Sequence, residues 1–211
     1  MPARIVVLAG VNGAGKSSVA GADIRAQGGE FFDPDVAARA LRDIRPELSA
    51  AEANAEAWEL GRRGLERALA RGEFFAFETT LGGKTIARLL LAGAGQGAEI
   101  HLTYVGLDSP ELHIERVERR VAAGGHAIPE AKIRERYTTS RENLIRLLPH
   151  LALLRVYDNS AEADPEQGRT PAPILLLRCR GARIEHLAPR SRVPAWAKSV
   201  LAAALARAPQ P

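Results

Sequence analysis

The feature that most constrains this chain is a glycine-rich turn directly after an apolar run near the N-terminus. Residues 5–9 read Ile-Val-Val-Leu-Ala, and the next nine read Gly-Val-Asn-Gly-Ala-Gly-Lys-Ser-Ser. A short, continuous, β-branched run is typical of a buried parallel strand. Residues 16–26 favour a helix that ends at Gly28 and Gly29. The turn is therefore expected to connect a central strand to a helix at one edge of a sheet.

The turn has the spacing of a phosphate-binding P-loop, Gly10-x-x-x-x-Gly15-Lys16-Ser17. Its glycines allow backbone angles and close approaches that side chains would block. The backbone N–H groups and the helix N-terminus attract anionic oxygens. Lys16 is expected to reach the β- and γ-phosphates, and Ser17 to bind Mg²⁺. We expect ATP with Mg²⁺ to bind at Gly10, Asn12, Gly13, Ala14, Gly15, Lys16, Ser17 and Ser18.

Strand-like and helix-like segments alternate along the rest of the chain. Strands are expected at 30–35, 73–80, 99–107, 152–160 and 174–184, the last with a turn at Gly181. Helices are expected at 36–44, 49–72, 84–95, 108–121, 129–148 and 194–206. Ser49 with Glu52 is a capping box, and Gly72 a helix stop. This order predicts one domain over residues 1–211, a three-layer α/β fold with a mainly parallel sheet and a helical lid at about 108–140.

The composition is that of an ordinary globular chain of 211 residues, 46% hydrophobic and 26% charged. No apolar stretch approaches the roughly 18 residues of a membrane span. The lone Cys179 cannot form an internal disulfide, which suits a reducing compartment. We therefore expect a cytoplasmic protein without membrane contact. The net charge of +4 is too small and too dispersed to indicate a nucleic-acid partner.

Polar clusters follow the second and third predicted strands, at the edge where open parallel sheets bind ligands. Asp33 and Asp35 can each cap the following helix or accept the proton of an acceptor hydroxyl. Glu78, Thr79 and Thr80 end the third strand. Glu78 either acts through a Mg²⁺-bound water or accepts a hydrogen bond from a substrate hydroxyl. The alternative is a polar strand end without a chemical role.

Arginines gather on the two helices predicted around the Gly124-Gly125 break. Arg116, Arg119 and Arg120 share one helix face, and His126, Arg134 and Arg136 follow the break. Inward-facing arginines on two helices with a glycine joint would form a closing lid that stabilises negative charge during phosphoryl transfer. The alternative is a solvated face on which they pair with Glu115, Glu118, Glu130 and Glu135.

The ordered combination of "GVNGAGKSS", "FFDPDVAA", "FAFETTL", "RVERRVAAGGHAIPEAKIRERY" and "VYDNS" resembles the zeta-toxin family of P-loop kinases, in particular its short chromosomal branch. The resemblance covers about residues 5–160. It implies a P-loop NTPase/kinase fold, use of ATP and Mg²⁺, and, as in the toxins, phosphorylation of UDP-N-acetylglucosamine at its 3′-hydroxyl. It also implies an antitoxin protein as partner.

Carried onto this sequence, the resemblance implies Asp35 as general base, Lys16 as phosphate ligand, and Glu78 and Thr80 as residues that hold the sugar. Its lid arginines would contact the γ-phosphate, here Arg116, Arg120, Arg134 and Arg136. Asp158, Asn159 and Ser160 would lie near the adenine. Two departures concern the acceptor side. The toxins have acid-Gly-Thr-Gly-Arg where this chain has Glu78 to Gly82, so a substrate-side arginine is missing, and His126 stands where a lid arginine is expected.

The leading hypothesis is an ATP-dependent kinase acting on a hydroxyl of a small molecule. Its expected acceptor side consists of Asp33, Glu78, Thr79, Thr80 and His126. A second hypothesis is a phosphotransferase for another acceptor, such as an antibiotic, a nucleoside or a nucleic-acid end. A third is a non-catalytic regulatory protein in which ATP orders the lid for a binding partner.

Overall fold

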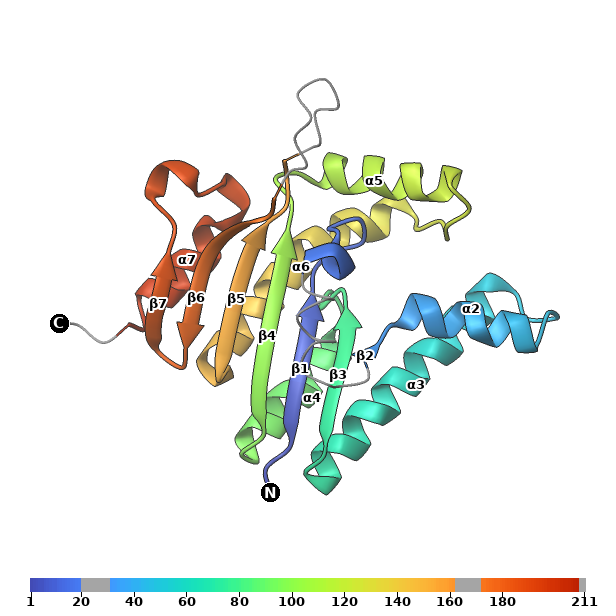
Figure 1. Cartoon of the computed structure of the whole chain (residues 1–211), viewed down its shortest axis with the longest axis horizontal. Helices are drawn as coiled ribbons and strands as arrows, with labels where there is room; N and C mark the ends of the chain where they lie inside the picture. Colours follow the sequence, from blue (N-terminus) through green and yellow to red (C-terminus); the bar gives the residue numbers. More distant parts are fainter. Residues whose placement is uncertain (20–30, 162–171, 209–211) are drawn as a thin grey trace.

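The computed structural model describes residues 1–19, 31–161 and 172–208 (Figure 1). The first helix begins at Lys16, as expected from the sequence, and is described as far as Val19. Its expected end at Gly28 and Gly29 lies outside the described residues, as does most of the loop expected before residue 174.

Within the described residues, a seven-stranded sheet has the order β2-β3-β1-β4-β5-β6-β7. The strands are β1 (Arg4–Ala9), β2 (Phe31–Phe32), β3 (Phe74–Thr79), β4 (Glu99–Gly106), β5 (Leu153–Asp158), β6 (Ile174–Arg180) and β7 (Arg183–Leu187). Strands β1 to β5 are mutually parallel, whereas β6 and β7 are antiparallel to their neighbours. Residues 174–187 thus form a hairpin with its turn at Gly181 (φ 55°), three residues longer than the predicted strand, and the sheet is mainly parallel, as predicted.

The described helices match the predicted segments closely. They are α2 (Pro34–Ile44), α3 (Ala50–Arg71), α4 (Lys84–Gly95), α5 (Pro110–Ala122), α6 (Glu130–Leu147) and α7 (Lys198–Leu205), with short 3-10 turns at Leu148–His150, Arg190–Arg192 and Ala195–Ala197. The capping box of Ser49 and Glu52 is present at the start of α3, and Gly72 ends it in the left-handed conformation. The last predicted helix is split, because its first turn is 3-10.

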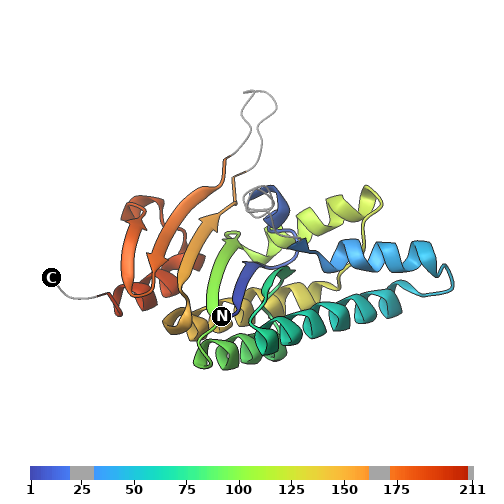
Figure 2. The ribbon, with the colours of Figure 1, turned by 60° about the horizontal axis from the view of Figure 1, so that its bottom comes forward.

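Alternate residues of β1 enter two different cores. Ile5 and Val7 belong to a large cluster that includes residues of α3, α4, α6 and α7, and Figure 2 shows these helices along one side of the sheet. Val6 and Leu8 belong to a smaller cluster with Val19 of the first helix. The period-two alternation of a strand therefore separates the layers of a three-layer α/β fold.

Two helical pairs, α2 with α3 and α5 with α6, extend to the right past the β2–β3 side of the sheet in Figure 1. Helices α2 and α3 pack through Ala38, Ala53 and Ala57. Helices α5 and α6 share a small cluster of Ile114, Val117 and Ile133 with Val11 of the P-loop, and this pair is called the lid here. The lid is therefore in contact with the P-loop itself. None of the described helices has the length and apolar character that a bilayer crossing requires.

Candidate nucleotide and acceptor site

The P-loop follows β1 and folds tightly against neighbouring strand ends. Gly10 has φ 147°, and a Cβ there would lie 2.3 Å from the Val105 carbonyl oxygen. Gly15 has φ 76°, and its Cβ would lie 2.5 Å from the side-chain nitrogen of Asn159. Both positions require glycine because side chains are strained at these angles and would collide with their surroundings.

Lys16 is buried at the centre of this loop. Its Nζ donates to the carbonyl oxygen of Gly10 at 2.8 Å and to that of Val11 at 3.4 Å. The same ammonium lies 3.1 Å from Oε1 of Glu78 at the end of β3. A buried cation within a loop of backbone N–H groups fits the polyphosphate of a nucleotide.

The carboxylate of Glu78 lies in an electrostatically unfavourable environment. Burial raises the pKa of its carboxyl, Lys16 lowers it, and the nearby Asp33 and Asp35 raise it further. Its Oε2 is buried and has no hydrogen-bond partner among the described residues. A carboxylate oxygen left unsatisfied is destabilising unless a ligand or water completes it.

The side-chain oxygens near the P-loop also fit a Mg²⁺ ion that is bound together with a nucleotide. Such ions keep waters and use one or two protein oxygens plus phosphate, and Ser17 and Glu78 carry oxygens of this kind. The described residues contain no cluster of three or more His, Cys, Asp or Glu side chains that would hold a metal alone.

The structure distinguishes the two aspartates at the start of α2. Asp33 is the N-cap, and its Oδ1 accepts hydrogen bonds from the backbone N–H of Asp35 at 2.8 Å and of Val36 at 3.4 Å. The carboxylate of Asp35 does not cap the helix. It pairs instead with Nη1 of Arg120 on α5 at 2.9 Å. Asp33 therefore has the structural role, and Asp35 faces the lid.

Arg120 connects α2 to the turn between the lid helices. Besides Asp35, it donates through Nη2 to the carbonyl oxygen of His126 at 3.0 Å. The ring Nε2 of His126 lies 3.0 Å from the side-chain nitrogen of Asn54 on α3. His126 thus bridges the lid and the α2–α3 pair, at the rim of the site.

The four other arginines that sequence reasoning placed around the Gly124-Gly125 break divide into two groups. Arg136 donates to Oδ1 of Asn12 at 2.9 Å, and its stem lies so close to Gly82 that a Cβ there would be 2.6 Å away. Arg116 packs beside Gly13 and donates to the carbonyl oxygen of Ala161 at 3.4 Å. These two arginines therefore contact the P-loop, whereas Arg120 contacts Asp35.

Arg134 and Arg119 behave as the solvated alternative predicts. Arg134 is exposed and pairs with Glu111 at 2.6 Å and with Glu130 at 3.9 Å. Arg119 is exposed and pairs with Glu115 one turn away. No contact of Arg134 with the P-loop or with Asp35 is seen among the described residues, although sequence reasoning grouped it with Arg116, Arg120 and Arg136.

A cavity of about 500 Å³ lies between the P-loop, the α2–α3 pair and the lid. All the residues predicted for the acceptor side line it: Asp33, Glu78, Thr79, Thr80 and His126. Asp35, Lys16 and Arg136 line it as well. We call it the acceptor cavity. Its lining brings together side chains from α2, α3, β3 and α6, which are distant in the sequence.

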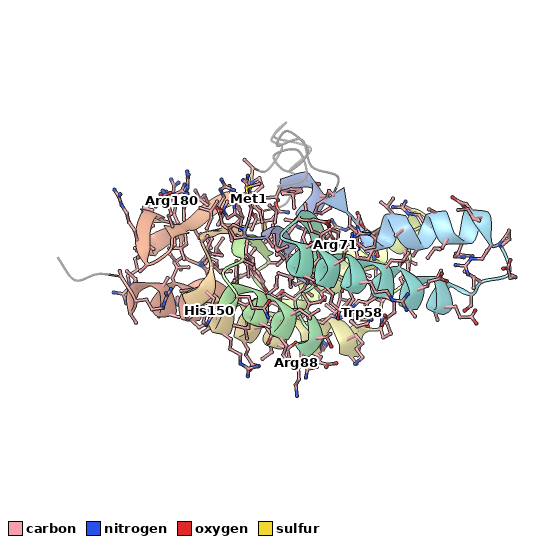
Figure 3. All side chains as sticks on the ribbon, turned by 90° about the horizontal axis from the view of Figure 1, so that it is seen from below. Met1, Trp58, Arg71, Arg88, His150 and Arg180 are labelled. Carbon is pink, nitrogen blue, oxygen red and sulfur yellow. The ribbon has the colours of Figure 1, made fainter. Side chains whose placement is uncertain are left out.

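Sequence reasoning missed the α3 wall of the acceptor cavity. Trp58 lies on α3 (Figure 3) and lines the cavity while 42% exposed. Phe32, from the end of β2, lines it nearby. The heavy exposure of a tryptophan at a cavity is the structural signal, and no sequence pattern singled it out within a long amphipathic helix.

The loop after β3 is held in an unusual conformation by α6. Leu81 has φ 55°, although it is not glycine, and its side chain is buried. Ser140 donates to the carbonyl oxygen of Thr80 at 2.8 Å, and Asn143 donates to that of Leu81 at 2.8 Å. Two buried polar residues three positions apart on α6 were the available sequence signal. They fix the hydroxyl-bearing end of β3 at the cavity.

His113 of α5 is buried against the P-loop and forms a hydrogen bond with its backbone. Its Nδ1 lies 2.8 Å from the carbonyl oxygen of Asn12, so Nδ1 carries the proton and donates. The side chain is 1% exposed, and burial lowers its pKa to about 4. His113 is therefore neutral in the folded protein at pH 7.

We predict a pH-dependent stability that depends on His113. The pKa of an ordinary imidazole is 6.5, and burial lowers that of His113 to about 4, so the unfolded chain binds the proton first as the pH falls. Stability is thus fully present above about pH 6.5 and declines towards pH 4, by about 2 kcal/mol between pH 7 and pH 5. The free energy of unfolding, measured in urea at pH 7 and at pH 5, should fall by this amount in the wild type. In His113→Asn, whose side chain keeps a donor but does not titrate, this part of the fall should be absent. An equal pH dependence in both proteins would contradict the prediction.

Asn159, expected near the adenine, lies at the P-loop itself. Its side-chain nitrogen donates to the carbonyl oxygen of Ala14 at 2.9 Å. Ser17 and Ser18, expected to bind Mg²⁺ and phosphate, are exposed at the start of the first helix. The predicted nucleotide-binding residues are therefore brought together around one loop.

This fold and this loop define a P-loop nucleotide-binding protein with a kinase-like, three-layer architecture. Residues 5–142 match the AAA domain family AAA_33, and the chain belongs to that family. An uncharacterized protein from Haemophilus influenzae is 28% identical over 137 residues, which are 65% of this chain and 94% of that protein.

Two solved structures show the same fold. The crystal structure of AvrRxo1-ORF1:-ORF2 with ATP aligns with a TM-score of 0.63 and 15% identity over 97% of this chain, which spans 64% of that chain's length. The PezAT chromosomal toxin–antitoxin system of Streptococcus pneumoniae aligns with a TM-score of 0.54 and 14% identity, covering 98% of this chain and 85% of that one. The resemblance to zeta-toxin-like P-loop kinases is thus confirmed at the level of the fold.

Proposed function

We propose that this protein is an ATP-dependent kinase that transfers the γ-phosphoryl group to a hydroxyl of a small-molecule acceptor. One observation carries the proposal. The carboxylate of Asp35, which does not cap α2, and the ammonium of Lys16 line the same cavity. Arg120 of the lid pairs with that carboxylate. Base, phosphate ligand and charge stabiliser are the three groups that phosphoryl transfer needs.

The roles follow from these positions. The P-loop backbone and Lys16 would hold the phosphates of ATP, and Ser17 with Glu78 would hold Mg²⁺, which neutralises phosphate charge. Asp35 accepts the proton of the acceptor hydroxyl while the hydroxyl oxygen of the acceptor bonds to the γ-phosphorus. The bond between that phosphorus and the bridging oxygen breaks, and ADP leaves with the electron pair.

In this proposal the guanidinium of Arg120 can pair with either of two anions, the carboxylate of Asp35 or the transferred phosphoryl group. In the structure it forms an ion pair with Asp35. A guanidinium matches phosphate oxygens as well as carboxylates. Transfer of Arg120 from Asp35 to the phosphoryl group would therefore free the base and stabilise the transferred charge together.

The acceptor cavity suits a sugar-containing molecule. It combines the exposed face of Trp58 with the hydroxyls of Thr79 and Thr80 and the carboxylate of Asp33. Aromatic faces with adjacent hydrogen-bonding groups are the usual combination for orienting polar ring ligands. UDP-N-acetylglucosamine, implied by the zeta-toxin resemblance, is the first acceptor to test.

We predict that Trp58→Ala raises the KM for the acceptor about tenfold and leaves the KM for ATP unchanged. Stacking of a nucleobase on an aromatic side chain contributes about 1–3 kcal/mol, and tenfold corresponds to about 1.4 kcal/mol. Leu60→Ala is the matched control, because Leu60 is on the same helix, 45% exposed and outside the cavity lining. Steady-state kinetics with varied acceptor measure both. Equal KM values in the two variants would show that Trp58 does not bind the acceptor.

The proposal is tested by labelled phosphoryl transfer. Purified protein is incubated with γ-labelled ATP and Mg²⁺, first with UDP-N-acetylglucosamine, then with nucleosides, antibiotics, nucleic-acid ends and a metabolite extract. We expect label on a small molecule. Tight ATP binding without any labelled product would overturn the kinase assignment and favour the regulatory hypothesis.

The proposal extends to the cellular context. An antitoxin partner is supported by the fold shared with PezAT, a toxin–antitoxin system. A cytoplasmic location is supported by the lack of membrane-spanning helices among the described residues and by the need for ATP. Toxicity on expression, relieved by a co-expressed partner, is the corresponding observation.

A further inference from the structure

Trp196 lies in the C-terminal part of the chain, beyond the residues 5–142 that match the family. It belongs to the 3-10 turn Ala195–Ala197 that precedes α7, and it is 3% exposed. A buried tryptophan usually has a partner for its indole N–H. Here the partner is a carboxylate at the end of β5.

Two donors converge on this carboxylate. The indole Nε1 of Trp196 donates to Oδ1 of Asp158 at 2.8 Å, and the hydroxyl of Ser160 donates to the same oxygen at 2.6 Å. Asp158 is buried, with 9% exposure. A buried carboxylate is destabilising unless such donors compensate its lost hydration. The pair of donors therefore fixes the turn that leaves β5.

That turn carries the side chain that reaches the P-loop. The backbone N–H of Asn159 donates to the carbonyl oxygen of Gly106 at 3.0 Å. Its side-chain nitrogen donates to the carbonyl oxygen of Ala14 and lies 2.5 Å from the position that a Cβ of Gly15 would take. Asn159 thus touches the two P-loop residues directly before Lys16. A shift of the turn would move this contact.

The ring of Trp196 is held from several sides. A Cβ on Gly106 would lie 2.4 Å from the ring, so the indole packs directly on the backbone at the end of β4. Its centroid is 5.9 Å from that of Tyr104. Arg141 of α6 donates to the carbonyl oxygen of Trp196 at 3.3 Å. Because these contacts hold the indole ring in one orientation, its N–H is directed at the carboxylate of Asp158.

We propose that Trp196 and Asp158 are positioning residues of the nucleotide site. The indole N–H orients Asp158, which fixes the turn after β5, so that Asn159 holds the Ala14 carbonyl and the glycine backbone beside it. The C-terminal segment thereby takes part in nucleotide binding without touching the nucleotide. This inference concerns nucleotide affinity and does not depend on the proposed phosphoryl transfer.

The test uses Trp196→Phe, which keeps an aromatic ring and removes the N–H. Binding of a fluorescent ATP analogue, the N-methylanthraniloyl ester, is measured by anisotropy on direct excitation, without acceptor. We expect Trp196→Phe and Asn159→Ala each to raise Kd about tenfold. The double variant should match Asn159→Ala alone within about threefold, because both changes remove the same contact. A role in folding alone would not produce this non-additivity.

Two further variants keep the test decisive. Ser160→Ala removes the other donor to Asp158 at a partly exposed turn, and should raise Kd about threefold, again without adding to Asn159→Ala. Leu205→Ala is the matched control on α7, 49% exposed, and should bind like the wild type. Wild-type affinity in both Trp196→Phe and Ser160→Ala, or effects that multiply with those of Asn159→Ala, would overturn the proposal.

Discussion

Asp35→Asn should lower kcat for phosphoryl transfer by about 10²–10⁴-fold, the usual contribution of a general base, with ATP affinity within about threefold of the wild type. Asparagine has nearly the shape of aspartate but cannot accept the acceptor proton at neutral pH. The substitution also removes the ion pair with Arg120, whose partners are 36% and 44% exposed. A pair this exposed contributes little to stability, so the fold should be unaffected.

Asp33→Asn is the matched control for this variant. Asparagine is as good an N-cap as aspartate, so α2 should begin as before, and the base at position 35 is untouched. We expect kcat within about tenfold of the wild type. Single-turnover transfer and equilibrium ATP binding separate chemistry from affinity. Near-normal turnover in Asp35→Asn, or a larger loss in Asp33→Asn, would rule out Asp35 as the base.

Arg120→Ala should lower kcat by about 10²–10³-fold, the range for removing one electrostatic stabiliser of the transition state. Arg120 is the lid cation that contacts the candidate base. Arg120→Lys should recover only part of the loss, because an ammonium lacks the planar fork of a guanidinium.

Arg134→Ala provides the comparison on the same lid. Its guanidinium pairs with Glu111 and Glu130 on the exposed face, where solvent screening makes ion pairs weak. We expect kcat within about threefold of the wild type. Comparable losses in Arg120→Ala and Arg134→Ala would mean that the lid closes with a different face inward than the structure shows. Thermal unfolding of both variants checks that neither effect is a loss of fold.

Local patterns predicted most of the elements. The capping box at Ser49 and the stop at Gly72 depend on residues within one turn, so the bounds of α3 were predictable. The same holds for α4, predicted at residues 84–95 and found there. The antiparallel hairpin β6–β7 was less predictable, because apolar strand patterns do not carry the direction of pairing. Only the turn at Gly181 pointed to it.

The candidate site was predictable by residue type but not by role. Asp33 and Asp35 have the same side chain two positions apart, and either fits the start of a helix. Which one caps was decided by the backbone at Asp33, which places its carboxylate against the N–H groups ahead. Likewise, the helical period groups Arg116, Arg119 and Arg120 only by face, and packing of the lid decides that Arg116 and Arg120 contact the site while Arg119 stays exposed.

By itself, the sequence determined the strand, glycine turn and helix of the P-loop, the alternation that leads to a three-layer fold, and the edge where the polar clusters meet. These depend on local backbone preferences and on periodicity, both readable within short windows. Only the tertiary structure decided the contacts of Glu78 with Lys16, Asp35 with Arg120 and Trp196 with Asp158. Such contacts join residues tens of positions apart, and their geometry depends on how helices pack on the sheet rather than on the residues near each partner.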